Sequence, residues 1–409
     1  MSRRSAHAVR FQRWSQTLMA TLLLAMGLSG LSSFGAGAAR GALAQSKHNL
    51  SASGAGMVKA NATAANAPAS EMCVFCHAPH SASHQAALWN HAASSAVYVP
   101  YQSSTAKASF GQPTGASRLC LSCHDGTVAL GMLKNRGGSV SFQGGVTVLP
   151  KSRSNLGTDL SDDHPISFQY SASLAAKDGS LLPPPRGGPV RLDANNELQC
   201  TTCHDPHENT YGKFLVMNNT GGALCLTCHN LNGWATGAHS LSPNRWNRIP
   251  PNPWPRTDGQ TVAANACENC HSPHNAGGNA RLLNSQAEEQ NCYPCHNGNV
   301  AAKNIQAEFN KASAHPVIQT AGVHDPMEMD LVSAGAKRHV ECVDCHDPHA
   351  AKAAGKTTPN SVSGALNGVR GINSAGANVS QITHEYELCL RCHGDTGKGP
   401  SPVPRQFPA

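Results

Sequence analysis

The chain has 409 residues, of which only 5% are aromatic and 13% charged, whereas glycine (38) and proline (26) are abundant. A chain of this length usually folds as two or three domains with apolar cores, but this composition is typical of loops and argues against layered helices and sheets. The net charge of +7 does not indicate nucleic-acid binding, because five arginines lie in the first 44 residues and leave 26 basic against 24 acidic residues.

The first 44 residues resemble an export signal. A basic segment with Arg3, Arg4, Arg10 and Arg13 precedes an apolar run, and Ala42-Leu43-Ala44 is a small-x-small cleavage site. A membrane anchor is the alternative, but the run from Leu18 to Leu31 is short and interrupted by glycine and serine. We therefore expect residues 1–44 to be a cleaved signal peptide, and the mature protein to be periplasmic, secreted or at the cell surface, without a transmembrane segment.

All 16 cysteines fall in eight Cys-x-x-Cys-His units, and none is left over. The units comprise Cys73, Cys76 and His77; Cys120, Cys123 and His124; Cys200, Cys203 and His204; Cys225, Cys228 and His229; Cys267, Cys270 and His271; Cys292, Cys295 and His296; Cys342, Cys345 and His346; Cys389, Cys392 and His393.

This unit is the attachment site of haem c, in which two cysteines form thioether bonds and the following histidine is the proximal iron ligand. With 22 histidines in 409 residues, eight histidines in eight such places are not chance. A zinc site does not require a histidine after every second cysteine, and two-residue disulfide loops are redox-active rather than structural. The sequence therefore predicts eight covalently attached haem c groups.

The first, third, fifth and seventh units share an extension that the others lack. Each reads Cys-x-x-Cys-His-x-Pro-His and is followed by an apolar patch, so that the repeat is a pair of units. The first cysteines of a pair are 25 residues apart in the two inner pairs and 47 in the two outer pairs, which indicates loop insertions in the outer pairs. The Pro-His histidines are His80, His207, His274 and His349.

A low-spin haem needs a second axial ligand, and a second histidine keeps its potential lower than methionine does. Three further histidines lie in similar loops between the pairs: His164, His239 and His315. Together with the Pro-His histidines they make seven expected distal ligands. An isolated loop histidine is more often merely solvated, and the eighth ligand stays open among His48, His84, His91, His324, His339 and His384, with His91 and His384 favoured because they lie in the long insertions. The methionines follow no repeat pattern.

The paired pattern Cys-x-x-Cys-His-x-Pro-His and Leu-Cys-Leu-x-Cys-His resembles the doubled-motif multihaem cytochromes, relatives of cytochrome c3. The resemblance is closest over residues 72–230 and looser over 267–393, where Asn291 replaces the usual leucine. It implies an electron carrier of the periplasm or outer surface in bacteria with anaerobic or metal-linked respiration. Some relatives form conductive filaments.

We expect a mostly irregular fold with short α-helices, very little strand and a core of stacked haems, since each haem has only about 46 residues to cover it. Helices should begin at or just after the Cys-x-x-Cys-His units. The expected domains are a flexible segment (45–70), tetrahaem module 1 (71–244), a linker rich in proline, tryptophan and asparagine (245–262), tetrahaem module 2 (263–396) and a flexible tail (397–409).

These features favour transfer of electrons between respiratory partner proteins through mostly bis-His, low-potential haems, with no catalytic residue. The first alternative is an octahaem oxidoreductase acting on a nitrogen or sulfur compound at one open haem, although no Cys-x-x-Cys-Lys variant marks such a site. The second is a subunit of an extracellular cytochrome filament, with self-association or an outer-membrane complex. No nucleic-acid partner is expected.

Overall fold

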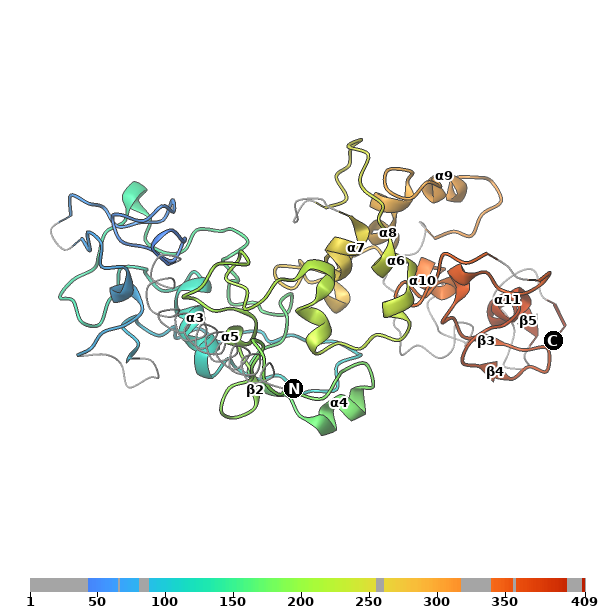
Figure 1. Cartoon of the computed structure of the whole chain (residues 1–409), viewed down its shortest axis with the longest axis horizontal. Helices are drawn as coiled ribbons and strands as arrows, with labels where there is room; N and C mark the ends of the chain where they lie inside the picture. The colour runs from blue at the N-terminus through green and yellow to red at the C-terminus, as the bar shows by residue number, and fades with distance from the viewer. Residues whose placement is uncertain are drawn as a thin grey trace, which may run out of the picture.

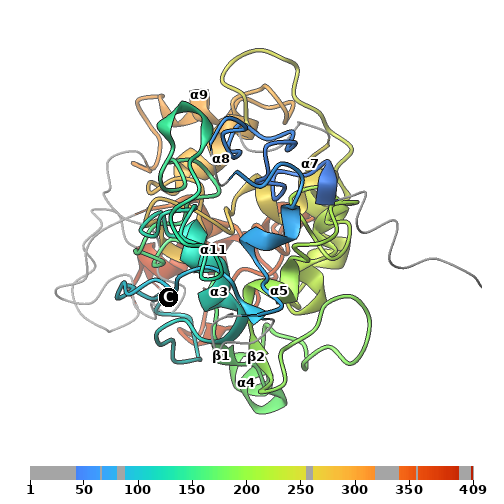
Figure 2. The same ribbon diagram turned by 90° about the vertical axis from the view of Figure 1, so that its left-hand side faces the viewer.

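The computed structural model describes residues 43–64, 67–80, 88–254, 261–317, 340–355, 358–395 and 407–408. Nearly all of the predicted signal peptide and most of the predicted tail lie outside these residues, as do His84, His324 and His339. The described chain is elongated, with its N-terminal residues (blue) at one end and its C-terminal residues (red) at the other (Figure 1). Figure 2 shows the same molecule from one end.

Short helices joined by long irregular segments make up most of the described chain, as the composition predicted. The α-helices are α3 (Gly115–His124), α4 (Ala172–Asp178), α5 (Cys200–Cys203), α6 (Ala238–Leu241), α7 (Val262–Asn265), α8 (Glu289–His296), α9 (Ile305–Phe309), α10 (Cys342–Cys345) and α11 (Glu385–His393). The 3-10 helices are η1 (Met72–Phe75), η3 (Gln143–Gly145), η4 (Thr220–Gly222), η5 (Cys225–Thr227), η6 (Trp234–Thr236), η7 (Ala266–Asn269), η8 (Ala280–Leu282) and η9 (Gly364–Leu366).

The strands form only small two-stranded sheets among the described residues. β1 (Phe168–Gln169) pairs antiparallel with β2 (Glu197–Leu198), with Phe168 opposite Leu198. β3 (Gly371–Ile372) pairs antiparallel with β4 (Asn378–Val379), and β5 (Gly394–Asp395) pairs in parallel with β6 (Phe407–Pro408). The prediction of a mostly irregular fold with short helices and very little strand is confirmed.

The longer helices end at the Cys-x-x-Cys-His units, whereas the shortest ones begin there. Helices α3, α8 and α11 each run through an even-numbered unit and end on its histidine, whereas the odd-numbered units contain a single helical turn, as in α5 and α10. Residues three apart share a face of a helix, so a helical turn places both cysteines of a unit on one side. The prediction that helices begin at or just after the units is confirmed for α5 and α10, which begin at the first cysteine of a unit. It is wrong for α3, α8 and α11, which begin before the unit and end on its histidine.

The apolar patch after each of the first three odd units folds back onto that unit. Antiparallel bridges join His77 to Trp89, His204 to Leu215 and His271 to Leu283. In each, the residue after the histidine donates its backbone N–H to the patch: Ala78 to Leu88 O at 3.0 Å, Asp205 to Phe214 O at 2.8 Å and Ser272 to Leu282 O at 2.8 Å. The repeat seen in the sequence is therefore also a structural repeat.

Clusters of buried apolar side chains are small. One comprises Ala60, Phe75, Leu130, Leu133, Val140 and Phe142, and the other Tyr98, Leu121 and Leu160. Ala60, in the segment expected to be flexible, is fully buried and donates its N–H to Leu50 O at 2.8 Å. Part of this segment is thus packed against the first pair of units.

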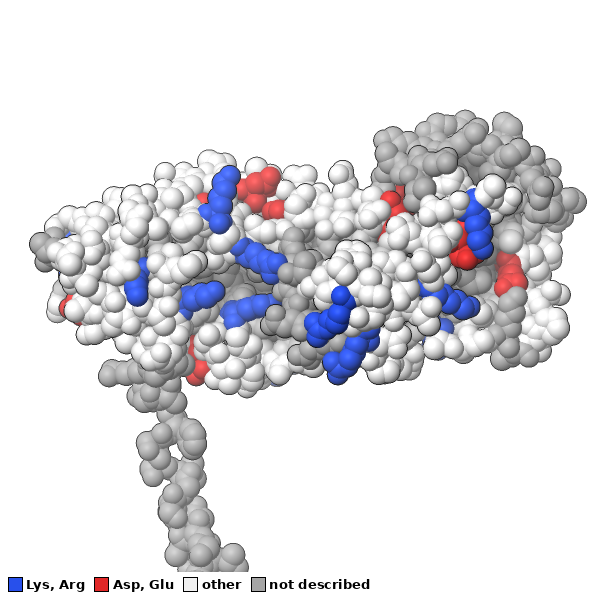
Figure 3. All heavy atoms as spheres, turned by 90° about the horizontal axis from the view of Figure 1, so that it is seen from above, with Lys and Arg blue, Asp and Glu red and all other residues white. Residues whose placement is uncertain are grey.

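The stretch expected to link two modules is also packed at its end. Trp254 is 2% exposed and donates from Nε1 to Asn269 Oδ1, at 2.7 Å, inside the fifth unit. Within the described ranges no helix is long and apolar enough to cross a bilayer. In the face shown in Figure 3, several Lys and Arg side chains lie along the middle of the molecule among uncharged residues, with fewer Asp and Glu.

Candidate functional site

Seven of the eight motif histidines face a second histidine at nearly the same distance. The distances between ring centres are 6.0 Å for His77 and His207, 6.0 Å for His124 and His48, 6.1 Å for His204 and His274, 6.3 Å for His229 and His164, 6.3 Å for His271 and His349, 6.1 Å for His296 and His239, and 6.3 Å for His393 and His315.

This spacing fits one iron between two imidazoles. A bond from a metal to a histidine nitrogen is about 2 Å long, and the ring centre lies about 1 Å further on, so two opposed ligands place their ring centres about 6 Å apart. Direct stacking of aromatic rings does not require such a uniform distance, since it ranges over about 4.5–7 Å. The residues present therefore fit a haem iron at each of the seven pairs.

The pairs follow two rules along the chain. Each odd-numbered unit faces the Pro-His histidine of the next pair of units: His77 faces His207, His204 faces His274, and His271 faces His349. Each even-numbered unit instead faces the loop histidine that precedes its own pair, as His229 faces His164 and His296 faces His239. Six of the seven Pro-His and loop histidines singled out in the sequence therefore face a motif histidine. His315 is one of them, because it faces His393. The exception is His80.

Backbone carbonyls orient the imidazoles. Nδ1 of the motif histidines lies 2.6 Å from Ser154 O for His124, 2.8 Å from Lys213 O for His204 and 2.9 Å from Arg281 O for His271. An Nδ1–H that donates to a carbonyl leaves Nε2 free as the metal ligand, which is the usual arrangement of a ligating histidine. Among the opposing histidines, Nδ1 of His239 lies 2.8 Å from Pro348 O.

Burial keeps several of these imidazoles neutral. It is the main cause that lowers the pKa of His48, His164 and His271 to about 4, and neighbouring histidines lower it further. Only a neutral imidazole binds a metal, so these side chains are in the ligating form at neutral pH.

His48 is the residue that the sequence signals least clearly. Its ring stacks on Phe214 with ring centres 4.1 Å apart, its Nδ1 lies 3.4 Å from Pro206 O, and it faces His124. Its position in the sequence indicates this role, because His48 precedes the first pair of units as His164 precedes the second.

The two histidines favoured for the eighth place lie elsewhere. His91 is 1% exposed, its Nδ1 is 3.0 Å from Ala92 O, and no motif histidine of the described chain faces it. His384 is exposed, is the N-cap of α11 and stacks on Tyr386. Local structure accounts for His384, whereas Nε2 of His91 is buried without a hydrogen-bond partner in the described chain.

His80 and His346 are left over from the pattern. Both are exposed, and in the part of the chain that the structure describes neither has a second histidine ring opposite it. His346 is nevertheless oriented like its equivalents, with Nδ1 2.9 Å from Ala365 O.

Cysteines of successive units interact in sequence order. In the unmodified chain, hydrogen bonds between thiols join first cysteines and raise the pKa of Cys120, next to Cys200, and of Cys292, next to Cys342. Second cysteines of the two units of a pair also interact electrostatically. One series of such interactions joins all eight units: Cys76 with Cys123, Cys120 with Cys200, Cys203 with Cys228, Cys225 with Cys267, Cys270 with Cys295, Cys292 with Cys342, and Cys345 with Cys392. The eight units therefore form one continuous line.

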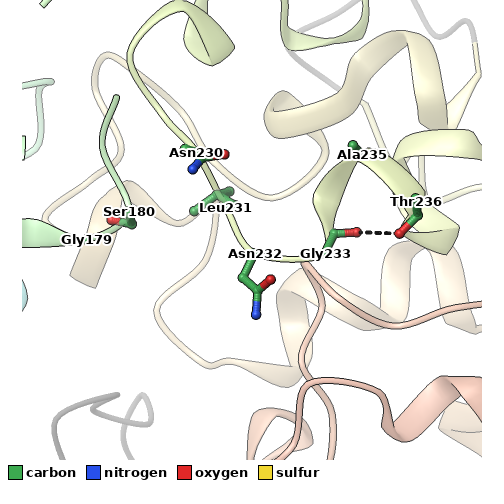
Figure 4. A pocket seen from close by; sticks show the side chains of 8 residues that line it. All are labelled: Gly179, Ser180, Asn230, Leu231, Asn232, Gly233, Ala235 and Thr236. Carbon is green, nitrogen blue, oxygen red and sulfur yellow. Dashed lines mark hydrogen bonds between the residues drawn. The ribbon is translucent and has the colours of Figure 1, made fainter. Parts of the chain in front are cut away.

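A separate cavity of about 560 Å³ lies beside the fourth unit (Figure 4). Its lining comprises Gly179, Ser180, Asn230, Leu231, Asn232, Gly233, Ala235 and Thr236. None of these side chains is ionisable, so the lining offers no general acid or base. Among the described residues, moreover, no three or more His, Cys, Asp or Glu side chains converge as a metal site made by the protein alone would require.

The comparison with known families supports the haem interpretation. A family model described as the doubled CXXCH motif matches residues 193–232 and 260–301, that is, the second and third pairs of units. No curated protein matches the chain. The chain thus carries doubled attachment motifs for covalently bound haem c, of the kind that marks multihaem c-type cytochromes.

Proposed function

We propose that this protein is an octahaem c-type cytochrome that transfers electrons between redox partners outside the cytoplasm. The observation that carries the proposal is the set of seven histidine pairs, with ring centres 6.0–6.3 Å apart. Two neutral histidines on one iron give a low-spin haem of low potential. Eight Cys-x-x-Cys-His units supply the covalent attachment.

The order of the haems follows from the contacts between cysteines. Because thioether bonds attach each haem at its edge, neighbouring cysteines bring neighbouring haem edges together. The contacts alternate between second cysteines, such as Cys76 with Cys123, and first cysteines, such as Cys120 with Cys200. Electrons would therefore pass from unit to unit in sequence order along the length of the molecule (Figure 1).

A carrier is favoured over an oxidoreductase because seven irons would have both axial positions filled. Chemistry on a nitrogen or sulfur compound needs an open iron with acid–base groups beside it. The cavity beside the fourth unit offers no ionisable side chain, and the haem of that unit would be held between His229 and His164.

Mass spectrometry of the purified, exported protein, with electron paramagnetic resonance of its oxidised form, tests this function. We expect eight haems per chain, a mature N-terminus near Gln45 and low-spin signals from at least seven haems. Fewer than eight haems, or high-spin signals from two or more, would overturn the proposal.

A further inference from the structure

Among the residues that the structure describes, the two rules of histidine pairing leave His80 without a motif histidine and His346 without a second histidine, toward opposite ends of the molecule. We infer that the haem of His346 takes its second axial ligand from His80 of a second copy of this chain. This inference rests on the proposed function, because it requires a haem at His346, and it adds a head-to-tail assembly and the residue that joins the copies.

The pairing of odd units shows the shift. His207, His274 and His349 each face the motif histidine of the preceding pair. By the same rule, His80 in the first pair would face the motif histidine of a preceding pair. His346 in the last pair would face the Pro-His histidine of a following pair. A second copy placed head to tail supplies both at once.

Both residues are suited to such a contact. His80 and His346 are exposed, as are the paired His207 and His315, so both can be reached by a second copy. The carbonyl of Ala365 holds Nδ1 of His346 at 2.9 Å, as Arg281 holds that of His271, so Nε2 of His346 is oriented for an iron. The first pair (blue) and helix α10 lie toward opposite ends of the elongated molecule (Figure 1).

The cysteines give an independent indication of the same joint. Between pairs, the first cysteine of an even unit meets the first cysteine of the following odd unit, as in Cys225 with Cys267. The rule leaves two first cysteines without such a neighbour, Cys73 and Cys389. Of the 16 cysteines these two alone are exposed, so a head-to-tail copy would bring Cys389 to Cys73 and continue the line of haems.

A second copy of this chain is the expected partner, because it would repeat a contact that already occurs between pairs of units within the chain. Each contact between successive pairs within the chain is made by the same elements, a Pro-His histidine and a first cysteine. A contact between the last pair of one copy and the first pair of the next repeats that contact, and a heterologous contact that does not close on itself extends into a filament.

The test compares His80→Ala with His384→Asn in the full, haem-loaded protein. His384 is another exposed histidine outside the pairs, and asparagine keeps a residue suited to its N-cap position. We expect the wild-type protein and His384→Asn to assemble, by light scattering and electron microscopy, and to show only low-spin haem. His80→Ala should be monomeric, with one high-spin haem in eight that added imidazole converts to low spin.

An experiment that mixes wild-type and variant chains tests which copy donates His80 and which copy accepts it. A His80→Ala chain can still accept His80 from a wild-type copy at its own His346 haem but cannot donate one, so small amounts should shorten wild-type assemblies. Full-length assemblies that remain entirely low-spin in His80→Ala would overturn the inference. So would a high-spin haem produced in the wild-type background by His324→Ala or His339→Ala, because the ligand would then come from the same chain.

The two proposals fail in different ways. A monomeric wild-type protein with eight low-spin haems would refute the assembly and leave the electron carrier intact. Fewer than eight haems, or several high-spin haems in the assembled wild-type protein, would refute the electron carrier itself.

Discussion

Asp163 lies against His274, with its Oδ1 2.9 Å from the imidazole Nδ1. The next residue, His164, faces His229, so one loop supports the histidines of two successive sites. The Asp163 side chain is buried and its Oδ2 has no hydrogen-bond partner. A buried carboxylate next to Nδ1 makes an imidazole a stronger electron donor toward a metal, which leads to the first prediction.

Substitution Asp163→Asn should raise the reduction potential of the haem between His204 and His274. Hydrogen bonds to charged groups contribute about 1.5–3 kcal/mol, and about 1.4 kcal/mol corresponds to roughly 59 mV for one electron, so a shift of about 60 mV or more is expected. Spectroelectrochemical titration measures it. Asp162→Asn is the matched control, because Asp162 accepts from the Gly277 N–H and should shift no potential; equal shifts in both variants would contradict the assignment.

Substitution His48→Ala should convert one haem, that of His124, to the high-spin state. His48 is the histidine opposite His124, at 6.0 Å between ring centres, and alanine cannot bind iron. The spectrum of His91→Ala should stay fully low-spin, although the loss of a buried side chain costs stability. Electron paramagnetic resonance counts the high-spin haems in both variants, and the opposite result would make His91 the ligand.

The carboxyl groups of Glu288 and Glu341 predict a pH dependence of stability. Both are 4% exposed, and burial first, then hydrogen bonding to Glu341, raises the pKa of Glu288 to about 9. The folded protein therefore binds a proton that the unfolded chain, with an ordinary carboxyl pKa of about 4.3, releases. Stability should fall as pH rises from about 4.3 to about 9, by up to roughly 1.4 kcal/mol per pH unit from this group.

Substitution Glu288→Gln should flatten that dependence while its amide oxygen still accepts from the Val343 N–H, which Glu288 Oε1 does at 2.8 Å. Denaturant unfolding at pH 5, 7 and 8.5 measures the slope. The neighbouring Glu289→Gln should leave the slope as in the wild type. An unchanged slope in Glu288→Gln would show that Glu288 is ionised in the folded protein.

Trp254→Ala should destabilise the third pair of units by about 3–5 kcal/mol, the usual cost of removing a buried tryptophan. Trp254 is 2% exposed and donates to Asn269 in the fifth unit. Trp246 is more exposed and lies under Arg248, 5.5 Å from its ring centre, so Trp246→Ala should cost about 1 kcal/mol or less. Thermal unfolding followed by haem absorbance compares the two, and similar losses would refute a packing role specific to Trp254.

Much of the fold was predictable because it is local. The scarcity of aromatic and charged residues predicted irregular chain with short helices, and this is confirmed. The start of α5 and α10 at a first cysteine agrees with the prediction. The position of α3 and α11 was not predicted, because they begin before the unit and end on its histidine.

The sequence by itself determined the attachment chemistry, since each Cys-x-x-Cys-His unit is five consecutive residues whose reactive groups need no distant partner. It also showed the repeat of pairs and the Pro-His histidines. Only the tertiary structure decided which histidines face each other. His48 and His124 lie on separate segments, and His207 faces a unit of the preceding pair rather than its own. An axial ligand is chosen by position in space, so composition and spacing can supply the candidates but not the pairs.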